Sequence, residues 1–207
     1  MRKTKTDFAY EQLKTLIAEE RITKGRIIAI GEIAGMLDLG RAPVLTAVKR
    51  LESEGFLQVV PQVGVILRDL TLTEVRNIND VRIAIECAII KEVTPYITAA
   101  KLEQARASIN EQAAAAEAQD FRRFVLADNF FHRRLYQESR NPEMVEIMRR
   151  LSDRLFSVSL CLIMYPGRMA TTVTEHKGVL DALAQGDADR AQTAMKTHLE
   201  NGKNLTL

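Results

Sequence analysis

Apolar residues recur at helical spacing through the last two thirds of the chain, and all three of its histidines fall within that pattern. Each histidine takes a position on the apolar face of a separate predicted helix, with His132 in 120–139, His176 in 170–185 and His198 in 187–201. Asp128 lies one helical turn before His132 and shares its face. Because an inward carboxylate is costly unless it is paired, the pattern predicts that these four side chains meet.

Six helices are predicted after residue 71, with clear breaks at Asn141-Pro142 and Pro166-Gly167. A further break at Gly186-Asp187 combines a C-cap glycine with an N-cap aspartate. On one continuous helix His176 and His198 would lie roughly 33 Å apart, whereas two antiparallel helices can bring them together. The predicted helices span 72–98, 101–118, 120–139, 142–164, 168–185 and 187–203.

The first seventy residues follow a different pattern, in which short helices alternate with β-branched runs. Their order is helix, short strand, helix, turn, helix and hairpin, which is typical of a winged helix-turn-helix. We therefore expect a mainly α protein with a DNA-binding domain over 1–70 and an all-α antiparallel helical bundle over 71–207. The predicted N-terminal elements are helices at Thr6–Arg21, Glu32–Leu37 and Pro43–Glu54, a strand at Ile27–Ile30, and a hairpin of Phe56–Val60 and Val63–Leu67 with Gly64 near its bend.

Composition narrows the class of protein. The net charge is only +2, but it is unevenly distributed. The segment between Leu39 and Leu51 carries Arg41, Lys49 and Arg50 and contains no acidic residue. No apolar run approaches the roughly 20 residues of a membrane span, and the N-terminus lacks the apolar core of a signal peptide. The two cysteines, Cys87 and Cys161, lie in apolar helical stretches and are expected to be packed thiols. We expect a cytoplasmic protein with no membrane partner.

A metal site is the hypothesis that we favour for the four polar residues. Three imidazoles and one carboxylate suit Zn²⁺, Ni²⁺ or Mn²⁺. The alternative is a set of core histidines bonded to backbone groups or carboxylates. A metallohydrolase is a further alternative, in which Glu175 would act as general base. Because Glu175 is adjacent to His176 on a helix, however, it should point away from the ion.

The segment GRAPVLTAVKRLESEGFL resembles the recognition-helix signature of the GntR family of bacterial transcription regulators. The resemblance is to the FadR-like branch, which carries an FCD effector domain. In the second part of the chain, DNFFHRRL, SRNPEM and EHKGVLDALAQGDADRAQTAMKTHL resemble FCD motifs. The recognition-helix positions that agree are Arg41, Pro43, Val44, Ala47, Arg50, Leu51, Glu52, Glu54 and Gly55.

The resemblance implies that Asp128, His132, His176 and His198 occupy the metal-ligand positions of the family. Arg82 fits the arginine of an Arg-x-x-x-Glu pattern on the first FCD helix, with Glu86 as its glutamate. Arg82 is therefore a candidate partner for a carboxylate effector. The alternative for Arg82 is a simple i,i+4 ion pair with Glu86.

The resemblance also implies a set of DNA-binding residues, although this chain departs from the family there. Leu45 and Thr46 stand where the family carries arginine and glutamate, and the wing VVPQVGV lacks the usual basic residues. Arg41 can still reach a phosphate or a guanine edge, and Leu45 can touch a thymine methyl or serve in packing. Solvated helix surface is the alternative for the charged members. The implied residues are Arg41, Pro43, Leu45, Thr46, Lys49, Arg50 and Gly64.

The function expected from these features is that of a homodimeric, ligand-responsive transcriptional repressor rather than an enzyme. Each recognition helix would enter a major groove of a palindromic double-stranded operator. The helical domain would bind a divalent metal ion and a small organic acid effector. The alternative within the same class is a metal-sensing regulator that responds to no organic effector.

Overall fold

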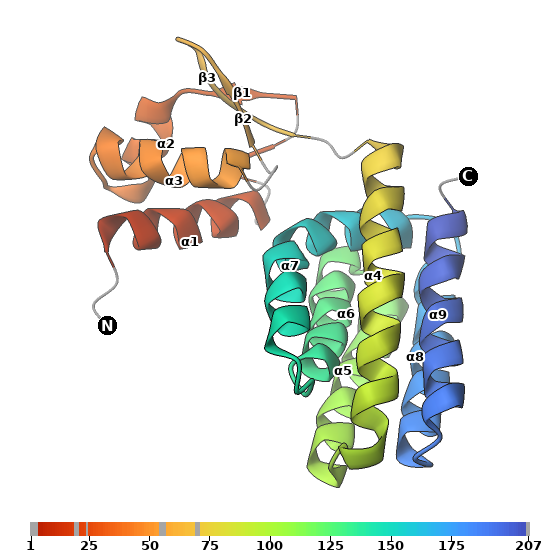
Figure 1. Cartoon of the computed structure of the whole chain (residues 1–207). Helices are drawn as coiled ribbons and strands as arrows, with labels where there is room; N and C mark the ends of the chain where they lie inside the picture. Colours follow the sequence, from red (N-terminus) through yellow and green to blue (C-terminus); the bar gives the residue numbers. More distant parts are fainter. Residues whose placement is uncertain (1–3, 19–20, 24, 54–56, 69–70, 206–207) are drawn as a thin grey trace. The chain divides into compact units, whose positions relative to one another are not determined.

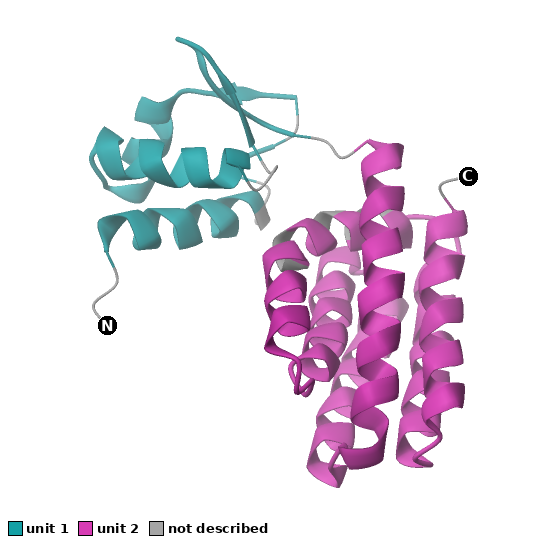
Figure 2. Ribbon diagram, in the orientation of Figure 1, with its two compact units in different colours: residues 1–69 teal, residues 70–207 magenta. Residues whose placement is uncertain are grey.

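The computed structural model describes residues 4–18, 21–23, 25–53, 57–68 and 71–205, so the predicted ends of the third helix and of the hairpin at 54–56 lie outside the described residues. Six side chains within these ranges are also outside the description, at 18, 152, 153, 157, 160 and 161. The chain divides into two compact units, Met1–Asp69 and Leu70–Leu207 (Figure 2).

The N-terminal unit packs two helices and a small sheet around a third helix. α1 and α2 both pack on α3, which also contacts β2. The three strands form an antiparallel sheet in the order β1-β3-β2. The core of the unit, between the helices and the sheet, includes Leu13, Ile33, Leu51 and Leu57, all essentially fully buried. The elements are α1 (Lys5–Ala18), β1 (Ile27–Ile28), α2 (Ile30–Leu37), α3 (Arg41–Ser53), β2 (Leu57–Val60) and β3 (Gly64–Leu67) (Figure 1).

This is the predicted winged helix-turn-helix, with two corrections to its details. The short strand β1 pairs with β3, so the wing is a three-stranded sheet rather than an isolated hairpin. α3 begins at Arg41, two residues before the predicted start at Pro43. Proline is tolerated throughout the first helical turn, since the amides there have no acceptor within the helix. Arg41 therefore belongs to the helix and not to the preceding turn.

Gly64 begins β3 opposite Val60 and lies against the backbone of β1. A Cβ atom at this position would lie 2.2 Å from the carbonyl oxygen of Ile28, far inside van der Waals contact. The wing can reach this pairing only if residue 64 has no side chain. Gly64 therefore has a packing role within its unit, and its contact with DNA remains a prediction.

Replacing Gly64 with alanine is expected to destabilise the N-terminal unit by at least the 1–3 kcal/mol typical of overpacking, because the methyl group must push β1 from β3. Thermal and denaturant unfolding of the variant measure this loss. Gly35→Ala is the control, since nothing lies within 4 Å of the position of its added Cβ. Equal stability of the two variants would contradict the close approach at Gly64.

The described part of the C-terminal unit, residues 71–205, is a bundle of six long helices. α9 packs against α4 and α8, α5 packs against α6 and α8, and α7 packs against α6 and α4. Its apolar core includes Phe124, Phe131 and Met195, each with no exposed surface. The helices are α4 (Leu72–Val93), α5 (Ala99–Glu117), α6 (Phe121–Tyr136), α7 (Pro142–Ile163), α8 (Arg168–Ala184) and α9 (Ala188–Asn204) (Figure 1).

The first of these helices is shorter than the sequence predicted, because α4 ends at Val93 and a 3₁₀ turn follows at Thr94–Tyr96. Pro95 explains the change, since it lacks an amide hydrogen and its ring opposes an α-helical turn before it. The predicted break between the last two helices is confirmed. Gly186 has φ +69°, and the Asp187 side chain accepts a hydrogen bond from the amide of Arg190 at the start of α9.

Among the described residues, no helix is both long and apolar enough to span a bilayer. Cys87 is a buried thiol on α4, as expected, whereas the side chain of Cys161 lies outside the description.

Candidate functional site

Three helices bring the predicted polar residues into one cluster in the interior of the bundle. Asp128 and His132 come from α6, His176 from α8 and His198 from α9. One ligand atom from each of the four lies within 4.8 Å of the others, and all four side chains are buried. The break at Gly186-Asp187 makes this meeting possible, because it folds α9 back along α8.

Each histidine is oriented by a hydrogen bond that its Nδ1 donates to a side chain outside the cluster. The acceptors are carboxylate or amide oxygens, so each bond fixes the proton on Nδ1 and leaves the lone pair on Nε2. The three pairs are His132 with Glu86 at 2.6 Å, His176 with Gln112 at 2.8 Å, and His198 with Glu175 at 2.8 Å.

The Nε2 atoms therefore face one another and Asp128. The Nε2 atoms of His176 and His198 are 3.2 Å apart, and Oδ1 of Asp128 lies 3.8 Å from Nε2 of His176 and 3.9 Å from Nε2 of His132. Ser159 donates to the other oxygen, Oδ2, of Asp128 at 3.1 Å. Converging lone pairs repel one another unless a cation lies between them, so the arrangement favours a bound ion.

A metal ion fits these distances and this donor set. Since Zn–N bonds are about 2.0–2.1 Å long, two nitrogens on one tetrahedral zinc ion lie about 3.4 Å apart. The buried Nε2 of His132 also has no hydrogen-bond partner among the described residues. An orphaned buried polar atom is costly, and a metal ion would satisfy it. The residues that could hold the ion are thus Asp128 through Oδ1 and the three histidines through Nε2.

Glu86 is the link between Arg82 and His132. Its Oε1 accepts from Nε of Arg82 at 2.7 Å, and its Oε2 contacts His132. Burial alone would raise the pKa of Glu86, but the charges of Arg82 and His132 and their hydrogen bonds outweigh it and hold that pKa well below its usual range. The ion pair with Arg82 is thus present, as the simpler alternative expected. It is buried, however, and it orients a histidine of the cluster.

Glu175 has the same role for His198. It accepts from His198 and from Nη1 of Arg168 at 2.9 Å, and Arg168 also donates to the carbonyl oxygen of His198. Burial raises the pKa of Glu175, yet the hydrogen bonds from His198 and Arg168 lower it to about 2. Because Glu175 binds Nδ1, the far side of the ring from the cluster, it is not placed to activate a metal-bound water.

His176 lies deepest in the cluster. Its ring is fully buried and stacks on Phe131 with the centroids 4.2 Å apart. Burial lowers its pKa well below the ordinary value, and the neighbouring His198 and His132 lower it further. Burial likewise lowers the pKa of His198 to about 4, although the bond to Glu175 acts against it. Both rings are therefore neutral at pH 7, as metal binding requires.

Replacing Glu86 with glutamine is expected to weaken zinc binding about 10–100-fold, the usual cost of losing a carboxylate that orients a metal-bound histidine. Competition with a chromophoric chelator measures the affinity. Glu92→Gln is the matched control, because Glu92 lies on the same helix and bonds to Tyr96 and Ser139 instead of a histidine. Equal affinities of the two variants would contradict the assigned role of Glu86.

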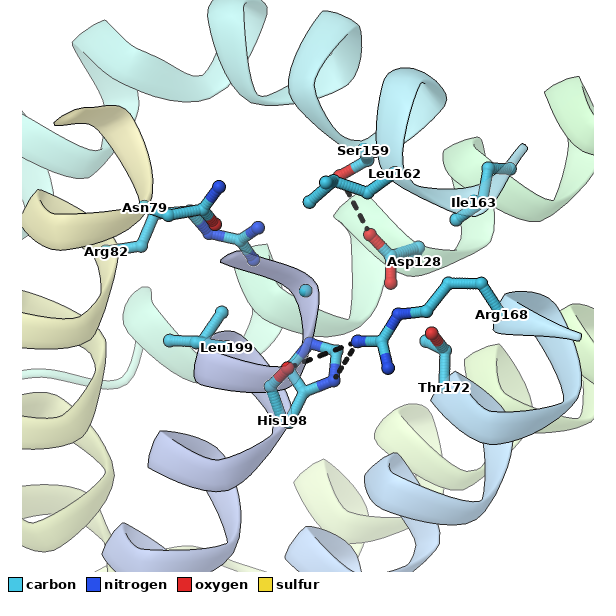
Figure 3. A pocket seen from close by; sticks show the side chains of 11 residues that line it. Asn79, Arg82, Asp128, Ser159, Leu162, Ile163, Arg168, Thr172, His198 and Leu199 are labelled. Carbon is cyan, nitrogen blue, oxygen red and sulfur yellow. Dashed lines mark hydrogen bonds between the residues drawn. The ribbon is translucent and has the colours of Figure 1, made fainter. Parts of the chain in front are cut away.

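A small cavity adjoins the cluster and shares Asp128 and His198 with it (Figure 3). Its volume is about 20 Å³, room for one or two water molecules. Five helices contribute to it, α4, α6, α7, α8 and α9. Its polar lining consists of Asn79, Arg82, Asp128, Ser159, Arg168, Thr172 and His198. The cavity thus combines two arginines with the edge of the candidate metal centre.

The structure brings Asp128, the three histidines and Arg82 into one region, as predicted. Sequence reasoning missed Gln112, the orienting roles of Glu86 and Glu175, and the buried Arg168 and Asn79. Gln112 lies 64 residues from its partner His176, so no local spacing could have shown the pair. The one available signal was the polar character of Asn79 and Gln112 at otherwise apolar positions of their helices.

The candidate nucleic-acid interface is the exposed face of α3. Arg41, Leu45, Thr46 and Lys49 are exposed there, with 40 % of Leu45 accessible. Neither Arg41 nor Lys49 has an ion-pair partner among the described residues, whereas Glu52 on the same helix is bound to the amide of Val59. Both basic side chains are thus available to phosphates or base edges.

Three of the predicted DNA residues are less available to DNA. The guanidinium of Arg50 stacks on the ring of Tyr10 in α1, 3.7 Å from the centroid, so it joins two helices. Pro43 is half-buried in the first turn of α3, and Gly64 is buried in the wing. Arg41, in contrast, lies against Gly31 of α2, where any side chain would press on its guanidinium.

Comparison with known proteins agrees with this architecture. The model of the bacterial regulatory proteins of the gntR family matches residues 5–67, and the model of the FCD domain matches residues 77–201. The HTH-type transcriptional repressor RspR of Escherichia coli (strain K12) is 26% identical over 194 residues, which cover 92% of this chain and 84% of that protein.

Solved structures show the same fold. A protein of Rhodococcus sp. RHA1 described as a GntR transcriptional regulator superposes with a TM-score of 0.84 at 21% identity, over 99% of this chain and 98% of that one. The E. coli protein McbR/YncC gives a TM-score of 0.83 at 18% identity over the same shares of the two chains. A winged helix-turn-helix joined to a helical effector domain defines a transcriptional regulator rather than an enzyme. The chain belongs to the GntR family and carries its FCD domain.

Proposed function

We propose that this regulator is a repressor whose C-terminal unit binds a divalent metal ion and, beside it, a small carboxylate effector. The observation that carries the proposal is the convergence of three Nε2 atoms on one oxygen of Asp128, with every Nδ1 already bonded elsewhere. Such a site can hold Zn²⁺, Ni²⁺ or Mn²⁺, and selection among them depends on geometry and supply.

The charge of the interior favours an anionic effector. Two arginines and three carboxylates lie in or beside the cluster, and together with three imidazoles in the neutral form that binds a metal ion they sum to one negative charge. A divalent ion would change this sum to one positive charge. A buried net charge is costly, so a monoanion would bind there favourably. The charged residues are Arg82, Arg168, Glu86, Asp128 and Glu175.

Arg82 is the better placed of the two arginines to receive that anion. Arg168 already donates to Glu175 and to the backbone of His198. Arg82 uses its Nε for Glu86, and the terminal groups of its guanidinium remain as donors for a carboxylate in the cavity that it lines. The carboxylate would reach the metal ion on its other side.

α4 supplies a route from the effector to DNA. It carries Arg82 and Glu86, and in the sequence only residues 69–71 separate it from Arg68, the residue after the last wing strand. A capping box of Thr71 and Glu74 fixes its start. An effector that binds Arg82 better in one position of α4 than in another would shift the population of dimer geometries, and a coupling of 1–3 kcal/mol is typical.

We further propose that the protein acts in the cytoplasm as a homodimer on a palindromic operator. Arg41, Leu45, Thr46 and Lys49 would enter the major groove from α3, with Pro43, Arg50 and Gly64 at the edge of the contact. Leu45 stands where the family carries an arginine, and its apolar side chain suits contact with a thymine methyl group.

A metal sensor without an organic effector is the alternative. Titration of operator binding, first with Zn²⁺ and then with a panel of short organic acids, separates the two. We expect at least one acid to change operator affinity of the zinc-loaded protein by 5–150-fold. A response to zinc and to none of the acids would favour the sensor instead.

A further inference from the structure

Asn79 is a buried polar residue that the proposed function does not yet use. It lies on α4 with 1% of its surface exposed and lines the cavity beside the candidate metal ligands (Figure 3). Its Nδ2 donates to the carbonyl oxygen of Val75 at 2.9 Å, which fixes the orientation of the amide. Its Oδ1 is then an acceptor with no hydrogen-bond partner among the described residues.

An unpartnered buried acceptor next to two arginines indicates what the cavity receives. Asn79 and Arg82 are three residues apart on one helix, so their side chains lie one turn apart on the same face. A ligand that satisfies both must present a carboxylate to Arg82 and a hydrogen-bond donor only a few ångströms away. The cavity has room for only one or two water molecules as it stands, so the side chains that line it must shift to admit a ligand, and a short chain requires the smallest shift.

The two arginines of the cavity distinguish between the two common donors. The guanidinium groups of Arg82 and Arg168 both line the cavity. Two cations repel the ammonium group of an α-amino acid, whereas the neutral hydroxyl group of an α-hydroxy acid avoids this repulsion. A hydroxyl group therefore fits the cavity better than an ammonium group.

We propose that Asn79 is a specificity-determining residue, whose Oδ1 accepts a hydrogen bond from a hydroxyl group adjacent to the carboxylate of the effector. The inference rests on the proposed function, since it takes the effector to be a carboxylate bound beside the metal ion. It goes further in assigning a short α-hydroxy acid as the effector class. An acid without the hydroxyl would leave Oδ1 buried and unsatisfied, which commonly costs about tenfold or more in affinity.

Calorimetric titration of the zinc-loaded full-length protein tests the proposal, with glycolate, acetate and glycine as probes. Wild type is expected to bind glycolate at least about tenfold more tightly than acetate or glycine. Asn79→Leu, which keeps the size but removes the acceptor, should bind glycolate and acetate equally. The control Thr172→Val removes a hydroxyl group from the lining of the same cavity and should keep the preference for glycolate.

Several outcomes would overturn the proposal. Equal binding of glycolate and acetate by wild type would overturn the proposal without any variant. The proposal can therefore be refuted even if the Asn79→Leu protein does not fold. A preference lost in Thr172→Val but kept in Asn79→Leu would assign the hydroxyl group to Thr172, and tighter binding of glycine would assign an ammonium group. If wild type binds glycolate and acetate equally, and Arg82→Gln weakens the binding of both acids, only the role of Asn79 is refuted. No binding of any acid would refute the carboxylate effector as well.

Discussion

Zinc is expected to raise the midpoint of thermal unfolding of the wild-type protein by about 10 °C and to leave His176→Ala almost unshifted. An ion at a thousandfold excess over its dissociation constant stabilises the folded state by about 4 kcal/mol. In a protein of this size 1 kcal/mol corresponds to about 2–4 °C. His176 has no exposed surface and lies at the centre of the cluster, so its loss removes a ligand that water cannot easily replace.

The shift between chelator and zinc is the quantity to compare, because His176→Ala also opens a cavity and lowers the stability of the metal-free protein. Asp128→Asn is a second variant that keeps the size of the side chain and should lose most of the shift. Ser108→Ala is the matched control, since Ser108 is buried in the same unit and, among the described residues, its hydroxyl group bonds only to the carbonyl oxygen of Ala105. A full zinc-induced shift in His176→Ala would contradict the site.

Arg41→Ala is expected to weaken binding to a selected operator about 5–150-fold, the cost of one lost bidentate base contact at 1–3 kcal/mol. Its guanidinium lies at the N-terminal end of α3, where recognition helices reach base edges. Fluorescence anisotropy with an operator enriched from random duplexes and with a scrambled duplex, both at one salt concentration, measures the loss. Binding to the scrambled duplex should fall much less.

Two neighbours provide the contrast. Lys49→Ala should weaken binding to operator and scrambled duplex alike and flatten the salt dependence, as expected for a phosphate contact. Arg50→Ala should mainly lower the stability of the N-terminal unit, because its guanidinium stacks on Tyr10. An operator-specific loss in Arg50→Ala that equals the loss in Arg41→Ala would contradict the assignment of base reading to Arg41.

The sequence predicted the fold and the four candidate ligands because both depend on local periodicity. The helical repeat sets the spacing of the apolar positions, and the three histidines stand at such positions. The turn between α8 and α9 is marked by Gly186-Asp187, two residues with strong conformational preferences. The same reasoning overestimated the length of α4, since it gave too little weight to Pro95 within an apolar run.

The surroundings of the cluster could not be predicted in the same way. Glu86 meets His132 across 46 positions of the chain, and Gln112 meets His176 across 64, so both contacts depend on how the helices pack. Arg50 shows the same limit in the N-terminal unit. Its place on the recognition helix suggested DNA contact, whereas packing of α1 on α3 provides an aromatic ring for it.

The most direct test of the metal centre is native mass spectrometry of the protein purified without chelator, beside Asp128→Ala and Ser108→Ala prepared identically. We expect one divalent ion per chain in wild type and in Ser108→Ala, and none in Asp128→Ala after dialysis. The mass would also identify the ion and any acid that remains bound with it. Wild type without an ion after exposure to Zn²⁺, Ni²⁺ and Mn²⁺, or Asp128→Ala with a full complement, would contradict the proposed site.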